Sequence, residues 1–557
     1  MQRSSRADIG PGSGYIWIGS RPWPAFSRVT NKKCDMKKFI HLLIIAILLA
    51  PLPACQVNPV TGERHFQVYG SDWEQQVGAQ MYSPLKQSQG GEFILDPALT
   101  SYVDEVGNKL AAQARRKDEL QFEFSILNDS TPNAWALPGG KLVINRGLLV
   151  ELESEAEMAA VLGHEIVHAD AAHGARQQST GMLAQLGAVA SMVVLGSTVD
   201  NQAAREIAML VPSVGAQLVM QKYGRDAERE SDEYGMRYMT EAGYDPQGAV
   251  ELQKKFVELS KDRNEDWLSG LFASHPPSQE RVDNNRATAA TLAAGGELGR
   301  ERYQSKTAYL RKVQPAYIAY DEAGKALGED KLDLAQEKLD FALDMEPREA
   351  LFMAMQGDIH ALRKKPGKAL AAYDKSIAAN SNLFYPHLRK GQVEYSEGNG
   401  KSARTSLERS LELLPTAEAY YILGMLDQAA GNNDSAVSNF TQAAQSNSTS
   451  GKRAKAELVR LDLGQNTSRY VATRAVLDSK GYVWVELGNL TEVPLRNIEI
   501  SIAWLDDAGQ ERQGKKIYKG PLGGGQQDRF RLDLKMPAVT DLSSRVRVQA
   551  SSATAAD

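Results

Sequence analysis

A repeat of about 34 residues constrains the fold of this chain more tightly than any other feature. Three glycines, Gly357, Gly391 and Gly424, follow one another at steps of 34 and 33 residues. A step of this length is that of one helix–turn–helix unit stacked on the next, with small residues where helices cross. Apolar residues keep the same step: Ala335, Ala369, Ala403 and Ala436, and Leu339, Tyr373, Leu407 and Phe440.

The period predicts tetratricopeptide repeats over residues 316–450. A generic helical bundle is the alternative, but a bundle has no reason to keep a 34-residue step. Such arrays form concave surfaces that bind peptides or partner proteins. A role as a rigid spacer stays open.

The remaining length predicts further domains, because 557 residues exceed what one hydrophobic core holds. After residue 468 the pattern changes to alternating apolar and polar residues, and residues 523–525 are all glycine. We therefore expect an antiparallel β-sandwich over 468–557. The strand signals are VWVEL (483–487), IEISIAW (498–504), RFRLDLK (529–535) and RVRVQ (545–549).

Residues 36–54 have the pattern of a secretory signal peptide. Two lysines precede an apolar run from Leu42 to Leu49, which is too short to span a bilayer. The end of the segment, Pro53-Ala54 before Cys55, resembles a bacterial lipobox. This resemblance implies that Cys55 is lipidated and becomes the first mature residue.

Residues 1–35 then read as a misassigned upstream extension. Gln56 after the cysteine implies an outer-membrane lipoprotein that faces the periplasm. A cleaved ordinary signal, which gives a soluble periplasmic protein, and an uncleaved anchor are the alternatives. The net charge of −5 and the absence of a basic block argue against a nucleic-acid partner.

Residues 55–292 form the predicted catalytic domain, and the Ala/Gly-rich stretch 293–315 is the predicted linker. Strand signals occur at 122–129 and 139–147. A capping box at Ser154 predicts a helix that runs to about Gly174. The apolar stretches 182–196 and 207–220 are too short to span a membrane and are interpreted as buried or membrane-surface helices.

The segment HEIVH carries the predicted chemistry. His164 and His168 are four residues apart, so a helix places both imidazoles on one face, where they can bind one zinc ion. Glu165 is rotated about 100° from His164 and can reach a water held on that metal. Glu165 would take the proton of this water and pass it to the leaving amine of a peptide.

A third metal ligand is expected in DAERESDEYG (226–235). Glu228 and Asp232 are four residues apart, so Glu228 can bind zinc while Asp232 orients a ligand histidine. One zinc ion per chain with an open fourth position is the catalytic arrangement. Without the preceding HEIVH, this segment would be interpreted as a solvated acidic helix face. His173 lies five residues after His168, off the ligand face, and is interpreted as structural or surface-exposed.

These segments resemble the HtpX/BepA-type zinc peptidases, a gluzincin family related to the CAAX-prenyl endopeptidases. The likeness covers about residues 55–290 and implies a mainly α-helical zincin-type domain with a small β-sheet. It also implies that His164, His168 and Glu228 hold zinc and that Glu165 is the general base. The matching segments are NPVTGERHF (58–66), NAWALPGGKLVINRGLL (133–149), HEIVH (164–168), ERESD (228–232) and SHPPSQER (274–281).

The same resemblance assigns the more distant residues. Asp232 would orient a ligand, and Arg281 would brace the loop that carries His275. His275 would lie over the metal, where it either stabilises the tetrahedral intermediate or fills the open site and keeps the enzyme latent. Without the resemblance, His275 reads as a loop residue. The residues Asn133, Ala134, Gly139 and Gly140 would belong to an edge strand to which a substrate chain adds.

The resemblance implies a cell-envelope zinc endopeptidase that hydrolyses misfolded or stalled outer-membrane proteins during β-barrel assembly. The repeats would contact the assembly machinery, and a lipid would hold the chain at the membrane. The alternative is a chaperone or scaffold whose repeats act while proteolysis is latent. The chain departs from the family pattern in its C-terminal β domain and in the absence of cysteines near the repeats.

Overall fold

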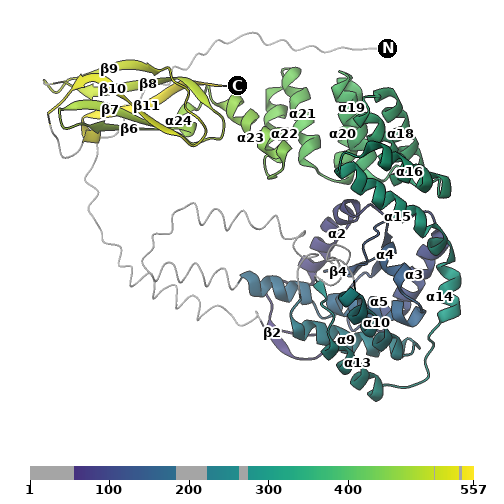
Figure 1. The fold of residues 1–557 in the computed structure, drawn as a ribbon. Coiled ribbons are helices and arrows are strands. Elements are labelled where there is room, and N and C mark those ends of the chain that lie inside the picture. The colour runs from purple at the N-terminus through teal and green to yellow at the C-terminus, as the bar shows by residue number, and fades with distance from the viewer. Residues whose placement is uncertain (1–54, 183–222, 263–273, 507, 538–541, 557) are drawn as a thin grey trace, which may run out of the picture. The chain divides into compact units, whose positions relative to one another are not determined.

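The computed structural model describes residues 55–182, 223–262, 274–506, 508–537 and 542–556. The predicted signal peptide, the upstream extension and the two apolar stretches after residue 182 lie outside this part of the chain. Within the described residues, none of the helices combines the length and apolar character needed to span a bilayer. Figure 1 shows a mostly helical chain that ends in a β domain.

The catalytic domain is built around a small three-stranded sheet with strand order β3-β5-β4. β3 runs parallel to β5, and β4 pairs with β5 antiparallel, so among the described residues β4 lies at an edge of this sheet. The predicted strand segments contain β3 and β5. The elements up to the sheet are β1 (Cys55–Val57), β2 (Arg64–Phe66), α2 (Ser71–Ser88), α3 (Pro97–Ala111), β3 (Glu123–Leu127), β4 (Ala134–Leu137) and β5 (Lys141–Asn145).

Both faces of this sheet are buried. Ala136 and Leu142 point into the main core that the sheet shares with α5, and Trp135 and Val143 point to the opposite side. There Tyr82 of α2 packs on them, and its hydroxyl donates to Ser125 Oγ at 2.9 Å. Strands that are covered on both faces have nearly continuous apolar sequences, which explains why these strands stand out in the sequence.

The helix that carries HEIVH is α5 (Glu155–Asp170), preceded by α4 (Arg146–Glu151). Its N-terminus forms as predicted, because Ser154 Oγ accepts a hydrogen bond from the Glu157 backbone N–H at 3.1 Å. The predicted end at Gly174 is wrong. α5 stops at Asp170, Ala172 adopts a left-handed φ of 55°, and the chain is helical again over 173–182.

A buried charge cluster fixes the end of α5. The carboxylate of Asp170 accepts hydrogen bonds from the backbone N–H groups of Arg115 and Arg116, both at 2.8 Å. The guanidinium of Arg116 in turn donates to Glu74 of α2 at 2.6 Å, and Glu74 is only 1% exposed. The chain reversal after α5 is therefore held by polar contacts that a helix pattern in the sequence does not reveal.

Three helices cover the other side of α5, namely α9 (Arg225–Glu241), α10 (Gln247–Asp262) and α13 (Gln279–Thr291). The predicted linker over 293–315 is not extended, because α14 (Arg300–Lys306) and the start of α15 (Ala308–Gly328) lie there. The hydroxyl of buried Tyr303 donates to the Leu149 carbonyl at 2.6 Å, and Arg311 donates to the Val150 carbonyl at 2.9 Å. These contacts make the stretch part of the catalytic domain's core.

The repeats are consecutive antiparallel helix pairs (Figure 1), and their spacing has a direct physical cause. A Cβ atom at Gly357, Gly391 or Gly424 would come within 2.4 to 2.7 Å of the large residue of the next helix. Those large residues are the ones that keep the 34-residue step. The helices are α15, α16 (Leu332–Met345), α17 (Ala350–Leu362), α18 (Pro366–Ala379), α19 (Phe384–Ser396), α20 (Gly400–Leu413), α21 (Ala417–Ala429), α22 (Asn433–Ala443) and α23 (Thr449–Asp462).

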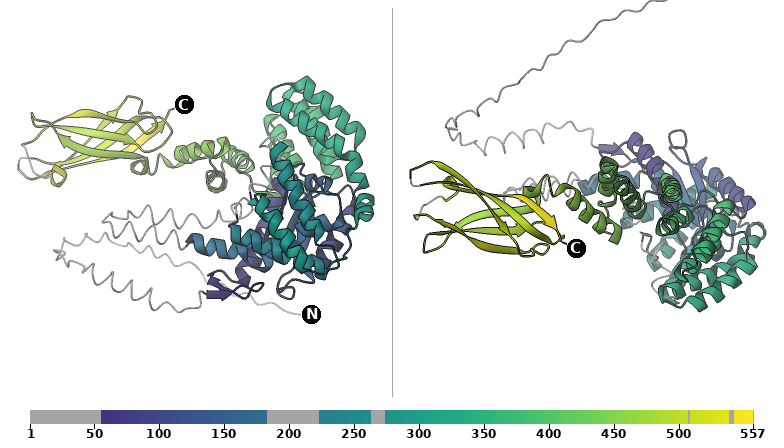
Figure 2. Two further views of the ribbon diagram at one scale, coloured as in Figure 1. Left: turned by 60° about the horizontal axis from the view of Figure 1, so that its bottom comes forward. Right: turned by 90° about the horizontal axis from the view of Figure 1, so that it is seen from above.

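The C-terminal domain is an antiparallel β-sandwich, as the alternation predicts. Its two three-stranded sheets have the orders β10-β7-β6 and β11-β8-β9, and Figure 2 shows them as two layers. Val485 and Ile500 are among the residues that fill the space between the layers. After α24 (Thr467–Tyr470) the strands are β6 (Val471–Leu477), β7 (Tyr482–Asn489), β8 (Leu495–Leu505), β9 (Glu511–Tyr518), β10 (Gln527–Lys535) and β11 (Val546–Ala555).

Replacement of Arg116 by Met tests the buried cluster at the end of α5. We expect the change to lower the free energy of unfolding by about 3–5 kcal/mol, because it leaves the buried Glu74 carboxylate without its partner. Chemical denaturation of the full chain measures the loss. The double variant Glu74→Leu with Arg116→Met should recover most of it, and Arg286→Met, which removes an exposed pair, should change little. Equal destabilisation by the single and double variants would contradict this explanation.

Candidate metal centre

Two glycines bring the helices of the site together. α5 and α9 cross at Gly163 and Gly235, where a Cβ on Gly163 would lie 3.0 Å from the Gly235 carbonyl oxygen. A Cβ on Gly235 would lie 2.9 Å from the backbone nitrogen of His164. The helix backbones therefore touch, and the side chains one or two turns away meet across the contact.

Four buried side chains converge beside this crossing. His164 and His168 come from α5, Glu228 from α9, and His275 from the segment before α13, and one ligand atom of each lies within 4.8 Å of the others. The Nε2 atoms of His164 and His168 are 3.0 Å apart. His275 Nδ1 lies 3.2 Å from His164 Nε2 and 2.8 Å from a Glu228 oxygen.

The contact of His164 with Asp232 assigns the tautomer of His164. His164 Nδ1 lies 3.0 Å from Asp232 Oδ1, and since a carboxylate only accepts, this nitrogen carries the proton. His164 Nε2 then holds a lone pair that points at His168 Nε2. If His168 Nε2 also holds a lone pair, the two lone pairs at 3.0 Å repel one another unless a cation lies between them, and the donor set then fits a metal ion.

The electrostatics of His168 and Glu228 favour the forms that bind a cation, whereas those of His275 favour its protonated form. Burial lowers the pKa of His168 well below its usual range and keeps its imidazole neutral. Burial opposes ionisation of Glu228, but His275 and the other imidazoles outweigh it and hold the pKa of that carboxyl far below its usual range. Burial also opposes protonation of His275, but the charges of Glu165 and Glu228 raise its pKa.

Asp232 and Arg281 lie next to the donor group. Arg281 Nε and Nη2 donate to the two Asp232 oxygens, both at 2.7 Å, and its Nη1 lies 3.0 Å from Glu228. Burial would raise the pKa of Asp232, but the Arg281 charge lowers it. Arg281 also donates to the Pro276 carbonyl at 3.3 Å, so one side chain connects α13, α9 and the loop of His275.

His173 takes the structural rather than the surface-exposed position of the two that the sequence left open. It is buried, and its Nδ1 lies 2.9 Å from His168 Nδ1 while its Nε2 lies 3.3 Å from Glu230. The Asn58 side chain of the N-terminal hairpin donates to Glu230. If His168 donates through Nδ1 to His173, its Nε2 lone pair faces the donor group. The break after α5, which the sequence did not reveal, turns His173 back toward His168.

Tyr223 is a further neighbour that the sequence did not indicate. Its ring stacks on His168, with the centroids 4.0 Å apart. Burial raises the pKa of Tyr223, so the ring is neutral at physiological pH. The two-glycine crossing and the contacts of Glu230 and Tyr223 join residues far apart in the sequence, for which a motif gives no signal. His173 is only five residues from His168 and reaches it because the chain turns after α5.

The predicted edge-strand residues lie around β4, outside the donor group. Ala134 begins β4, and the Asn133 carbonyl accepts from the Asn145 N–H at 2.8 Å. Gly139 and Gly140 form the turn to β5 with φ of 87° each, a conformation that favours glycine. A Cβ on Gly139 would also lie 2.9 Å from a carbonyl of α2, so this turn has a packing role. Cys55 begins β1, and its lipidation stays a prediction.

Two parts of the chain match models of known protein families. Residues 97–289 match the model of peptidase family M48, and residues 320–383 match a tetratricopeptide-repeat model. The M48 match contains His164, His168, Glu228 and His275. The chain is therefore a metalloprotease that combines an M48 peptidase domain with tetratricopeptide repeats.

Two kinds of relative are similar to this chain. The beta-barrel assembly-enhancing protease of Escherichia coli (strain K12) is 25% identical over 416 residues, which cover 66% of this chain and 84% of that protein. The mitochondrial metalloendopeptidase OMA1 of Schizosaccharomyces pombe is 28% identical over 226 residues, 40% of this chain and 63% of its own length. OMA1 of Arabidopsis thaliana is 32% identical over 174 residues, which cover 31% of this chain and 33% of that protein.

The variant Gly235→Ala tests the helix crossing. Because its methyl group would meet the α5 backbone, we expect α9 to shift, to misplace Glu228, and to lower zinc affinity at least about tenfold. Equilibrium zinc binding to the purified chain measures the effect. Gly367→Ala is the matched control, because that position has open space. Unchanged zinc affinity in Gly235→Ala would show that the crossing does not set the donor positions.

The variant His173→Ala tests the contact behind His168. We expect zinc affinity to fall about 10- to 100-fold while the fold persists, because His168 loses the group that orients its ring. His173→Asn, which keeps a hydrogen-bonding side chain, should restore part of the affinity. His360→Ala removes a histidine of the repeats and serves as the control. If His173→Ala binds zinc like the wild type, His173 has no positioning role.

Proposed function

We propose that this chain is a zinc endopeptidase of the bacterial cell envelope that hydrolyses misfolded or stalled outer-membrane proteins. The observation that carries the proposal is the buried group of His164, His168 and Glu228, with Glu165 beside it, inside the M48 match. Nitrogen and carboxylate donors in this combination suit zinc best among the common divalent ions. His164, His168 and Glu228 would hold one zinc ion.

Zinc, when bound, supplies Lewis acidity that activates a water and polarises the substrate carbonyl. Glu165 accepts the proton of the attacking water and later delivers it to the nitrogen of the leaving amine. Its carboxylate is buried, and an oxygen lies 3.4 Å from His275 Nε2, which places it at the donor group. Asp232 keeps the His164 proton on Nδ1, and Arg281 holds Asp232 in place.

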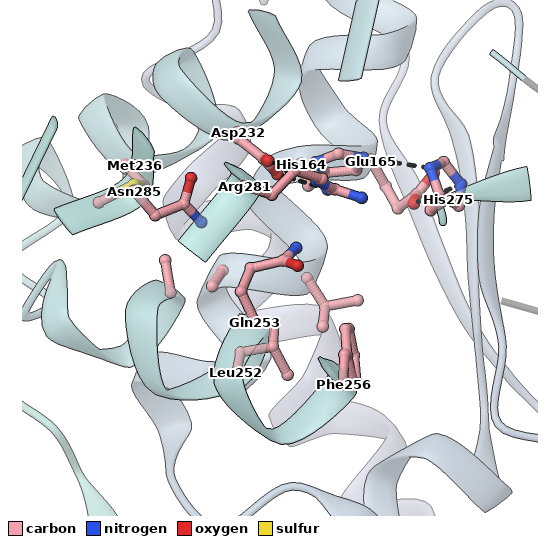
Figure 3. A pocket seen from close by; sticks show the side chains of 13 residues that line it. His164, Glu165, Asp232, Met236, Leu252, Gln253, Phe256, His275, Arg281 and Asn285 are labelled. Carbon is pink, nitrogen blue, oxygen red and sulfur yellow. Dashed lines mark hydrogen bonds and ion pairs between the residues drawn. The ribbon is translucent and has the colours of Figure 1, made fainter. Parts of the chain in front are cut away.

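The position of His275 keeps two roles open for it. Its ring nitrogens lie 3.4 Å from an oxygen of Glu165 and 2.8 Å from an oxygen of Glu228. Figure 3 shows His275 beside Glu165. If its loop moves with substrate, the protonated imidazole can stabilise negative charge on the tetrahedral intermediate. If the loop stays in place, the imidazole occupies the fourth donor position and the enzyme is latent.

Substrate presentation would use the edge of the sheet. β4 pairs with β5 on one side, and the strand order leaves its other side at the edge. Ala134 and Ala136 of this strand belong to the core that also holds α5, the helix of the donor group. An extended substrate chain that adds to β4 as a further strand would run beside α5. Strand addition to a sheet edge is a common way in which proteins bind extended segments.

Relatives and the sequence support the proposed substrate class and location. The Escherichia coli relative is named for its action in β-barrel assembly, and the likeness covers 84% of it. The signal segment and Cys55 support a lipoprotein of the outer membrane that faces the periplasm, with a soluble periplasmic protein as the alternative. The repeats would bind the assembly machinery or the substrate.

The second candidate function is a chaperone or scaffold in which proteolysis is latent. It is favoured by one observation, namely that His275 Nδ1 already lies within the donor group. In that case the repeats would act on outer-membrane protein assembly independently of cleavage.

The variant Glu165→Gln separates the two candidates. We expect it to bind zinc like the wild type but to lose cleavage of an unfolded outer-membrane barrel protein by about a thousandfold or more, because the proton acceptor is gone. Zinc content and gel-based cleavage are the measurements, with Glu258→Gln, a change at an exposed residue of α10, as the control. Full rescue of every deletion phenotype by Glu165→Gln would contradict the peptidase role and support the scaffold.

His275→Ala tests the latent state. If His275 holds the enzyme latent, the variant should cleave the same barrel protein faster than the wild type, at equal zinc content. If His275 stabilises the intermediate, cleavage should fall about 100-fold. An unchanged rate would remove His275 from the mechanism.

A further inference from the structure

A small cavity opens beside the donor group and is not used by the chemistry described above. Its volume is about 40 Å³, and His164, Glu165 and His275 form one side of it. The opposite walls come from α10, whose residues Leu252 and Phe256 lie one turn apart on the face turned to α5. The remaining apolar lining residues are Ala160, Val161, Met236 and Ala249.

The cavity exists because small residues face one another across it. Ala160 lies one helical turn before His164 on α5, and Ala249 lies on α10. The two helices approach closely at Gly248, where a Cβ would lie 2.6 Å from the Ala156 side chain. Longer side chains at Ala160 and Ala249 would fill the space.

One polar group in the cavity has an unmet hydrogen bond. Gln253 of α10 is only 5% exposed, and its Oε1 atom has no hydrogen-bond partner within the part of the chain that the structure describes. Figure 3 shows its amide pointing from α10 toward Arg281 and His164. A buried polar atom without a partner costs about 1–3 kcal/mol, so a ligand group that satisfies it gains binding energy.

We infer that this cavity is a specificity pocket that receives a substrate side chain next to the scissile bond and selects threonine. The inference rests on the proposed peptidase function and names the side chain that this active site prefers. The hydroxyl of threonine would pair with the Gln253 amide, and its methyl group would contact Val161 and Leu252. A hydroxyl both donates and accepts, so it fits either orientation of the amide.

Size and charge exclude most other side chains. One water needs about 10–15 Å³ of such space, so the cavity holds about three non-hydrogen atoms, the size of a threonine or valine side chain. Arg281 in the lining is already paired with Asp232 and Glu228, and His275 lies against Glu165 and Glu228, so neither offers a free charge to an acidic residue. Aromatic and long side chains do not fit this volume.

The experiment compares two peptides that differ only in threonine or valine beside the cleaved bond. These residues have the same shape, so the ratio of their kcat/KM values measures the hydrogen bond to Gln253. The position is first found by mapping wild-type cleavage sites in an unfolded barrel protein by mass spectrometry. Zinc-loaded full chain is used throughout, with Gln253→Leu as the test variant and Gln247→Leu, an exposed residue on the same helix, as the control.

We expect wild type and Gln247→Leu to prefer threonine about tenfold and Gln253→Leu to prefer valine. Ala249→Leu should disfavour both peptides and move cleavage to glycine or alanine. If wild type and Gln253→Leu cleave with the same threonine-to-valine ratio of kcat/KM, the proposed pocket is wrong while the proposed peptidase function stands. Absence of any cleavage by the zinc-loaded wild type would overturn the proposed function and the pocket with it.

Discussion

The backbone contact between α5 and α9 sets the geometry of the site. Two helices meet at Gly163 and Gly235 without intervening side chains, and a single methyl group at either residue would collide with the facing backbone. At this separation Asp232 reaches His164 and Glu228 reaches the space beside His168. Because side-chain reach is fixed, an increase of the helix separation by an ångström would take the carboxylates out of range.

Buried charges are the second condition, and each is stabilised by a neighbour. Arg281 neutralises Asp232 and Glu228, His173 contacts Glu230, and Arg116 is paired with Glu74 behind the end of α5. A buried charge without a partner costs several kcal/mol, so these pairs are required once the charges are inside. The network runs from the N-terminal hairpin, through Asn58 and Glu230, to the helix that carries HEIVH. The hairpin is far from the motif in sequence but takes part in the same structure.

The sequence predicted features whose cause is local or periodic. His164 and His168 share a face because a helix repeats every 3.6 residues, and Ser154 caps that helix through a contact three residues away. The glycine step in the repeats corresponds to a contact that recurs in each unit. The strands of the sandwich that alternate strongly were predicted, whereas β9 was missed because most of its side chains are exposed. β6 was missed as well, because its alternation is weak.

What the sequence by itself determined is the set of domains, the helix that carries the two histidines, and the residue types that suit zinc. Only the tertiary structure decided where α5 ends, that His173 turns back to His168, that 300–328 joins the catalytic core, and that Gln253 faces a cavity beside Glu165. The physical reason is the range of the interactions. Helix periodicity and capping act over a few residues and leave a pattern in the chain. Burial, charge pairing and backbone contact join residues tens to hundreds of positions apart, and they are satisfied only when the chain is folded.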